Sequence, residues 1–149
     1  MSLTTRPLMV IEADVAAPVI VGDPGGGVRR YVPITGGRVT GEVQGRVLPG
    51  ADWQTVLADG TIELAAHYAL ETETGARLEV ISNGVRSGPP EVMERLGRGE
   101  GVDPSLYYFR TSMRFRTGAP ELARLNTVLA IAVAERRANV VVLTVHEVE

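Results

Sequence analysis

The chain offers few kinds of side chain that could carry out chemistry. It has no cysteine, two histidines and one tryptophan, and all 15 of its basic residues are arginine. Thiol nucleophiles, Schiff-base lysines and the lysine of a phosphate-binding loop are therefore excluded. The remaining chemistry is proton transfer by carboxylates or histidines, hydrogen bonding by tyrosines, and anion binding by arginines.

Asp52 is the carboxylate that we rank first as a candidate acid–base residue. It precedes Trp53 in residues 50–54, at the entrance of a predicted strand. A charge beside a large aromatic ring either caps a turn or is held in a pocket where its pKa can be tuned. We expect Trp53 to bind ligand at the same site.

Arg110 lies among aromatic residues in the predicted strand 107–116. A guanidinium in a strand needs a carboxylate partner or a substrate anion. One interpretation is an ion pair with Asp52 inside the fold, and the other is ligand binding. Tyr108 would add a hydroxyl group if the face that carries Arg110 points inward.

His67 and Tyr68 are consecutive in a predicted strand, so one should point into the fold and the other outward. Both are ligand-binding candidates, although His67 could equally be a solvent-exposed residue. Asn126 could bind a ligand or cap a turn. His67 and His146 lack the spacing of a metal site, so we predict no metal and no cofactor.

The elements that must position these residues are mostly strands. Alternation at period two indicates strands at residues 53–57, 62–72 and 77–83. They follow one another across short turns, which is typical of an antiparallel meander. Other strands are predicted at residues 8–15, 18–21, 28–34, 38–48, 107–116, 128–133 and 140–148. Gly41 and Gly45 indicate tight bending, as at a barrel corner.

Turns, loops and helices occupy the rest of the chain. A turn at residues 35–37 is expected to end the strand before it. One short helix is predicted at residues 88–97, after a proline pair, and a brief helical turn at residues 119–126. The glycine-rich stretch 22–27 lacks the pattern of a phosphate-binding loop and is interpreted as a flexible connection.

Length and charge limit the classes of protein. With 149 residues, the chain fits one domain with a substantial core. A net charge of −3 gives no general attraction to nucleic acid or anionic membranes. No signal peptide or membrane-spanning stretch is recognisable, so we expect a cytoplasmic protein. Association into homo-oligomers is left open.

The sequence thus predicts an all-β fold with one or two short helices, forming a single domain over residues 1–149. Closing the meander into a barrel would hide its edge strands. Several stretches form a specific set that spans nearly the whole chain. They comprise residues 32–37, 47–54, 84–86, 88–92, 107–111, 115, 117–120 and 125–126.

This set resembles the bacterial and fungal family called domain of unknown function 3237, also named uncharacterised protein family 0311. The resemblance implies a closed antiparallel β-barrel of roughly eight strands. It implies no agreed reaction. The chain has methionine at position 113, where the resemblance would lead us to expect proline, and this departure lies outside the matched stretches.

Three functions remain compatible with the sequence. The first is binding of a small apolar or oxygenated organic molecule in the barrel mouth. The second is a cofactor-independent lyase, isomerase or cyclase, in which Asp52 moves a proton while Arg110 and Trp53 position the substrate. The third is a structural or assembly module with a filled barrel. Fold alone does not choose among them, and we adopt ligand binding as the working hypothesis.

Overall fold

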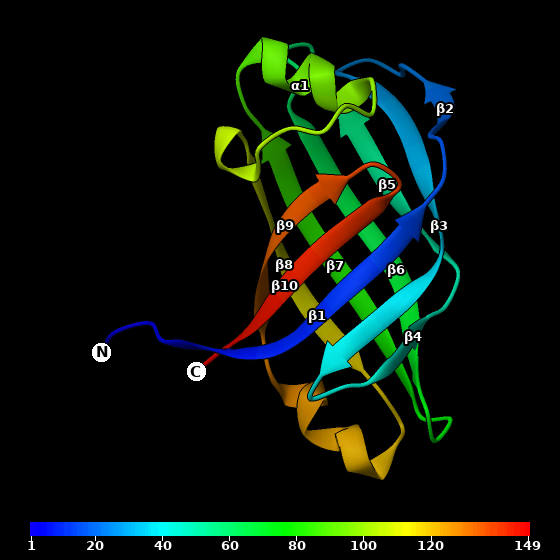
Figure 1. The fold of residues 1–149 in the computed structure, drawn as a ribbon, viewed down its shortest axis with the longest axis vertical. Coiled ribbons are helices and arrows are strands. Elements are labelled where there is room, and N and C mark those ends of the chain that lie inside the picture. The colour runs from blue at the N-terminus through cyan, green and yellow to red at the C-terminus, as the bar shows by residue number, and fades with distance from the viewer.

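The computed structural model describes all 149 residues, and most of them lie in antiparallel strands that wrap into a barrel (Figure 1). The strands are β1 (Thr5–Val15), β2 (Val19–Gly22), β3 (Val28–Gly41), β4 (Gly45–Val47), β5 (Gly50–Val56), β6 (Ile62–Thr72), β7 (Arg77–Ser87), β8 (Tyr108–Arg116), β9 (Ala130–Arg137) and β10 (Val140–Val148). The helices are α1 (Pro90–Gly97) and the 3₁₀ helices η1 (Pro104–Leu106) and η2 (Pro120–Thr127). No helix is long and apolar enough to span a bilayer.

The barrel closes because β1 pairs with both β10 and β3. From β10 the wall continues through β9, β8, β7 and β6. The place between β6 and β3 is shared by two short strands, β4 and β5, and each of them pairs with both neighbours. The wall therefore has eight strand positions, and β2 pairs with β3 outside this ring. The closed antiparallel barrel expected from the sequence is confirmed, as is the meander formed by β5, β6 and β7.

Strand β3 differs from the prediction, because the expected turn at residues 35–37 does not interrupt it. Pairing with β1 passes directly from Ile34 to Gly36, which leaves Thr35 as an extra, bulged residue. Ile34 and Val39 consequently both face the interior, although strict alternation would put them on opposite faces. Gly37 has a φ of 131°, and a Cβ there would lie 2.0 Å from the Glu12 carbonyl oxygen.

The predicted strand at residues 38–48 was wrong in the opposite sense, because the structure divides it. Strand β3 ends at Gly41, whose φ of 116° turns the chain away, and β4 begins at Gly45. The expected bend at these glycines is present, but it separates two strands instead of curving one. The helices predicted at residues 88–97 and 119–126 are confirmed as α1 and η2.

The two ends of the barrel are closed by different helices (Figure 1). Helix α1 covers one end, and η2 covers the other with the buried side chains of Leu122 and Leu125. The half nearer η2 is packed solid. Its fully buried side chains include Ile11, Val39, Leu70, Leu78, Met113, Phe115, Leu125 and Val145.

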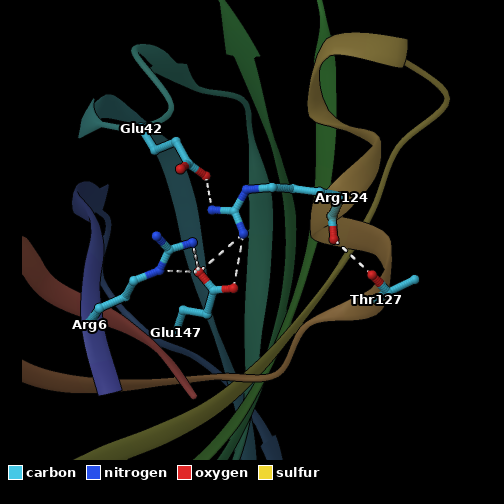
Figure 2. Close-up of polar contacts among 5 residues, drawn as sticks. All are labelled: Arg6, Glu42, Arg124, Thr127 and Glu147. Carbon is cyan, nitrogen blue, oxygen red and sulfur yellow. Dashed lines mark hydrogen bonds and ion pairs between the residues drawn. The ribbon is translucent and has the colours of Figure 1, made fainter. Parts of the chain in front are cut away.

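A charged cluster ties η2 to the barrel wall (Figure 2). Glu147 of β10 is 6% exposed and accepts hydrogen bonds at 2.9 Å from Arg6 of β1 and from Arg124 of η2. Arg124 also pairs with Glu42, between β3 and β4. The hydrogen bonds from Arg124 and then Arg6 hold the pKa of Glu147 below its usual range.

Gly37→Ala should destabilise the protein by about 2 to 4 kcal/mol, because it combines a left-handed backbone with a clash against Glu12. Gly36→Ala is the matched control, since a Cβ there meets nothing closer than Asp14 Oδ2 at 3.8 Å. Urea unfolding of both variants measures the difference. Equal stabilities would show that β3 can follow another path.

Glu147→Gln should lower the free energy of unfolding by about 1 to 2 kcal/mol, because two arginines lose their shared carboxylate in a partly exposed setting. The lowered pKa means that this stabilisation is present above the unfolded-state pKa and is lost as the pH falls. Thermal melting at neutral and acidic pH tests both statements. The exposed pair of Glu12 with Arg38 is the control, and Glu12→Gln should melt like the parent.

Candidate functional site

The half of the barrel nearer α1 contains a cavity, hereafter the α1-end cavity. It measures about 570 Å³ when its open mouth is included, and 10 of its 16 lining residues are hydrophobic. The centres of water molecules can occupy about 50 Å³ of it, which is several times the ~10–15 Å³ that one water requires. The apolar wall includes Val15, Val32, Ile34, Leu64, Phe109 and Leu143.

Strand alternation explains why the cavity lies at this end. On β8, Phe109 and Thr111 line the cavity, whereas Met113 and Phe115 continue the same face into the packed half. On β6, Leu64, Ala66 and Tyr68 likewise precede the fully buried Leu70. On these two strands the polar inward residues Thr111 and Tyr68 therefore border the cavity, and the inward residues beyond them are large and apolar.

Four buried polar atoms that line this cavity have no hydrogen-bond partner. They are Asp52 Oδ1, Tyr68 OH, Arg86 Nε and Thr111 Oγ1. Their residues come from β5, β6, β7 and β8, which are neighbouring strands. A buried polar atom without a partner costs about 1–3 kcal/mol, and such atoms are few in native proteins. Four such atoms on one cavity make it the candidate functional site.

Asp52 is held by one oxygen and free at the other. Gln54 Nε2 donates a 2.8 Å hydrogen bond to Asp52 Oδ2, and Gln54 Oε1 accepts one of 2.8 Å from Arg30 Nε. The amide orientation follows from its partners, since a guanidinium can only donate. Burial raises the pKa of Asp52 to about 6, against the opposing effects of Gln54, Arg86 and Arg30. The carboxyl group can therefore exchange a proton near neutral pH.

Arg86 is the most buried cation of the site, at 4% exposure. Its guanidinium carbon lies 5.7 Å from the centre of the Phe109 ring, in a cation–π arrangement. Burial, with the nearby charges of Arg136 and Arg30, lowers its pKa to about 10, so it remains protonated at neutral pH. Burial, reinforced by the charge of Asp52, raises the pKa of Tyr68, whose phenol is thus a neutral hydrogen-bond donor.

Of the candidates on β5 and β6, the structure brings Asp52 and Tyr68 together at the cavity and separates Trp53 and His67 from them. Trp53 is 41% exposed on the outer face of β5, where its ring centre lies 4.8 Å from that of Tyr31. His67 is exposed on the outer face of β6, and its Nε2 lies 2.5 Å from Glu79 Oε2. Trp53 was expected at the same site as Asp52, but Asp52 occupies the inward phase of β5 and Trp53 the outward phase.

The proposed pairing of Asp52 with Arg110 was also wrong. Phe109 and Thr111 point inward, so Arg110 and Tyr108 must point outward, where the guanidinium lies 5.0 Å from the Tyr108 ring centre. Arg110 Nη1 donates to the Phe109 carbonyl oxygen at 3.0 Å and has no carboxylate partner. Both residues line a groove on the outside of β8 and β9.

Asn126 lies far from the cavity, in η2. Its side chain accepts a hydrogen bond of 2.8 Å from the Thr117 backbone N–H and donates one of 3.0 Å to the Thr117 carbonyl oxygen. It therefore holds the connection between β8 and η2. No three His, Asp or Glu side chains come together anywhere in the structure as a metal site would require.

Sequence reasoning missed several residues of the site, namely Arg30, Gln54, Ser82, Arg86, Thr111 and Arg136. Their positions along the strands were a usable signal, because they share the phase of residues that face inward. Gln54 lies two residues after Asp52, and Thr111 lies between Phe109 and Met113 on a face that is otherwise apolar. A polar residue on the apolar phase of a strand indicates an interior polar group.

Asp52→Asn should raise the free energy of unfolding at pH 7.5 by about 2 to 3 kcal/mol. The folded protein retains the Asp52 proton between the ordinary pKa of 3.8 and about 6, whereas the unfolded chain releases it. Stability from this group therefore falls as the pH rises through that window and is not regained above it. Urea unfolding at pH 3.5 and 7.5 should show the gain only at the higher pH.

Asp59→Asn is a suitable control for this experiment, since Asp59 is a surface residue that accepts a hydrogen bond from the Thr61 backbone N–H at 2.9 Å. That hydrogen bond lowers the pKa of Asp59, so this variant should gain nothing at pH 7.5. A loss of stability in Asp52→Asn at pH 7.5 would mean that its polar contacts outweigh the cost of its burial.

Comparison with known proteins gives a consistent result along the whole chain. A UPF0311 protein of Bradyrhizobium diazoefficiens is 47% identical over 99% of this chain and 97% of its own length. The crystal structure of a conserved protein of unknown function from Rhodopseudomonas palustris is 44% identical, with a TM-score of 0.96, and covers 100% of this chain and 99% of that one. A β-barrel-like protein from Acinetobacter baumannii is 34% identical, with a TM-score of 0.87 over 100% of this chain and 98% of that one.

The sequence profile of the family described as "Protein of unknown function (DUF3237)" matches residues 3–148. This match covers every strand of the barrel and all the residues of the α1-end cavity. The chain therefore belongs to the DUF3237 family, whose members are also named UPF0311 proteins.

Proposed function

We propose that this barrel binds a small organic molecule with a compact apolar body and at least one oxygen-bearing group. The ligand occupies the α1-end cavity. Its apolar body packs against Leu64, Phe109 and Leu143, and its polar group meets the atoms of Asp52, Tyr68 and Thr111 that lack partners. Cavities with apolar walls and a few convergent polar groups are typical of small-molecule sites.

One observation carries this proposal, namely the four partnerless polar atoms on a single apolar cavity. A barrel that served only as a structural or assembly module would gain stability by filling this space, as the half nearer η2 is filled. Retaining a cavity with unsatisfied polar groups costs stability, and such costs are typical of functional sites. The binding function accordingly has more support than a filled structural module.

A second candidate function is a cofactor-independent enzyme of the lyase, isomerase or cyclase kind. It is favoured by Asp52, whose pKa of about 6 suits a general acid or base near neutral pH. Tyr68 and Arg86 would stabilise an oxyanion that forms on the substrate. A substrate that is bound by both the parent and Asp52→Asn, but is turned over only by the parent, would establish this function over simple binding.

The binding proposal predicts that filling the cavity abolishes binding. Ala66 lines the cavity beside Asp52 and Ser82, and Ala65 lies next to it on the outer face of the same strand. Ala66→Phe should therefore eliminate binding, whereas Ala65→Phe should leave it unchanged. Suitable single-ring probes are benzyl alcohol, benzamide and benzoate, for which we expect a Kd of about 1 mM or lower for at least one.

Isothermal titration calorimetry with the parent and both variants makes this measurement, and thermal melting verifies that each variant is folded. If none of the three probes binds the parent, the binding proposal fails. It also fails if Ala66→Phe, correctly folded, binds the probes as well as Ala65→Phe does.

A further inference from the structure

Three arginines from separate strands converge on the α1 end of the barrel. Arg30 comes from β3, Arg86 from β7 and Arg136 from β9. Arg86 and Arg136 line the α1-end cavity, and Arg30 and Arg86 line a cleft beneath helix α1. The charges of Arg30 and Arg136 both lower the pKa of Arg86, so the three guanidinium groups lie within range of mutual repulsion.

These three guanidinium groups lack carboxylate partners, although ion pairs are common elsewhere in the protein. Ten ion pairs engage other arginines or a histidine, and none includes Arg30, Arg86 or Arg136. Arg30 Nε donates to Gln54 and Arg136 Nε donates to the Ala138 carbonyl oxygen, so both are held by neutral acceptors. Arg86 Nε has no acceptor at all.

The cavity is lined by more cationic than anionic side chains, whereas the cleft beneath α1 contains Asp59 and Glu94 beside Arg30 and Arg86. Asp52 is the one carboxylate among the residues that line the cavity, which also include Arg86 and Arg136, and the charges of Arg86 and Arg30 act on it. A buried cation without a counter-ion is strongly unfavourable. Arg86 is 4% exposed, so water compensates little of its charge, and the Phe109 ring supplies only a cation–π contact. A bound anion would provide the missing counter-charge and the missing hydrogen-bond acceptors.

The positions of the charged and apolar groups also define how such an anion would lie. Arg86 borders both the cavity and the cleft beneath α1, so it lies between them. Deeper in the cavity, apolar side chains such as Leu64, Ala66 and Leu143 lie among the polar side chains of Asp52, Ser82 and Tyr68. An inorganic anion would match the arginines but leave this space unfilled, whereas an organic anion matches both.

We infer that the natural ligand is an organic anion of the carboxylate class, with its acidic group on Arg86 between Arg30 and Arg136 and its apolar body inside the barrel. This inference rests on the proposed binding function and names the chemical class of the ligand. Asp52, Tyr68 and Thr111 remain available for a second oxygen on the apolar body.

Benzoate and benzamide test this inference, because they share one shape and differ in charge at neutral pH. Calorimetric titration should show benzoate binding at least about tenfold more tightly than benzamide, the ratio expected for one charge-assisted hydrogen bond. The advantage of benzoate should shrink as salt is added. Inorganic phosphate serves as a third probe, and it should bind more weakly than benzoate because it leaves the apolar wall unoccupied.

Arg86→Met should remove the preference for benzoate while preserving the fold, since it replaces a partnerless buried cation by an apolar side chain of similar length. Its melting temperature should equal or exceed that of the parent. Arg114→Met is the matched control, because Arg114 is exposed on the outer face of β8 and forms no ion pair or hydrogen bond. If Arg86→Met fails to fold, Arg136→Gln provides the second variant and should reduce the preference severalfold.

The outcomes separate the two proposals. If benzamide binds as tightly as benzoate, or if folded Arg86→Met keeps the full preference, the anion inference is overturned and the binding function stands. If phosphate binds more tightly than benzoate, the site is for inorganic anions and the inference is again wrong. If benzoate, benzamide and benzyl alcohol all fail to bind, the binding function fails and the inference fails with it.

Discussion

The alternation of side chains in a closed sheet is the constraint on which the rest of this structure depends. Each strand must send every second residue into a shared interior. A closed barrel has no open edge, so every inward side chain must be accommodated there. The interior here is divided along the barrel axis. Phe115 and Leu70 pack the half nearer η2, whereas Thr111 and Tyr68, on the same faces of the same strands, border the cavity nearer α1.

This division separates the parts that stabilise the protein from the parts that form the candidate site. The packed half, together with the Glu147 cluster that fastens η2, supplies apolar burial and satisfied ion pairs. The half nearer α1 carries polar atoms that lack partners and a buried cation, Arg86, that forms no ion pair. A protein can retain such costly groups only if other regions provide the stability, and the two halves of this barrel have those complementary roles.

Most strands, the meander and both main helices could be predicted because they leave strong local patterns, whereas the closed barrel of about eight strands was what the family resemblance implied. The candidate site was harder to predict, since it depends on which phase of each strand faces inward. For β6 the alternatives were stated correctly, and the structure places Tyr68 inside and His67 outside. For β8 the local pattern did not fix which residues face inward, because Tyr108 and Phe109 are both aromatic. The ion pair considered between Asp52 and Arg110 is absent. Arg86 was overlooked because the predicted strand ended at residue 83, whereas β7 continues to Ser87 and turns Arg86 inward.

The bulge at Thr35 makes β3 a strand with two phases joined by a single spacer residue. On the side of the bulge nearer the cavity, even-numbered residues such as Val32 and Ile34 point inward, and beyond it odd-numbered ones such as Val39 do. The parity of the inward residues of β3 therefore changes at the bulge, between the cavity and the packed core. If Thr35 instead joined the ladder as a regular residue, strict alternation from Ile34 would turn Arg38 inward in place of Val39, so the packing of this strand depends on the bulge being kept at this point.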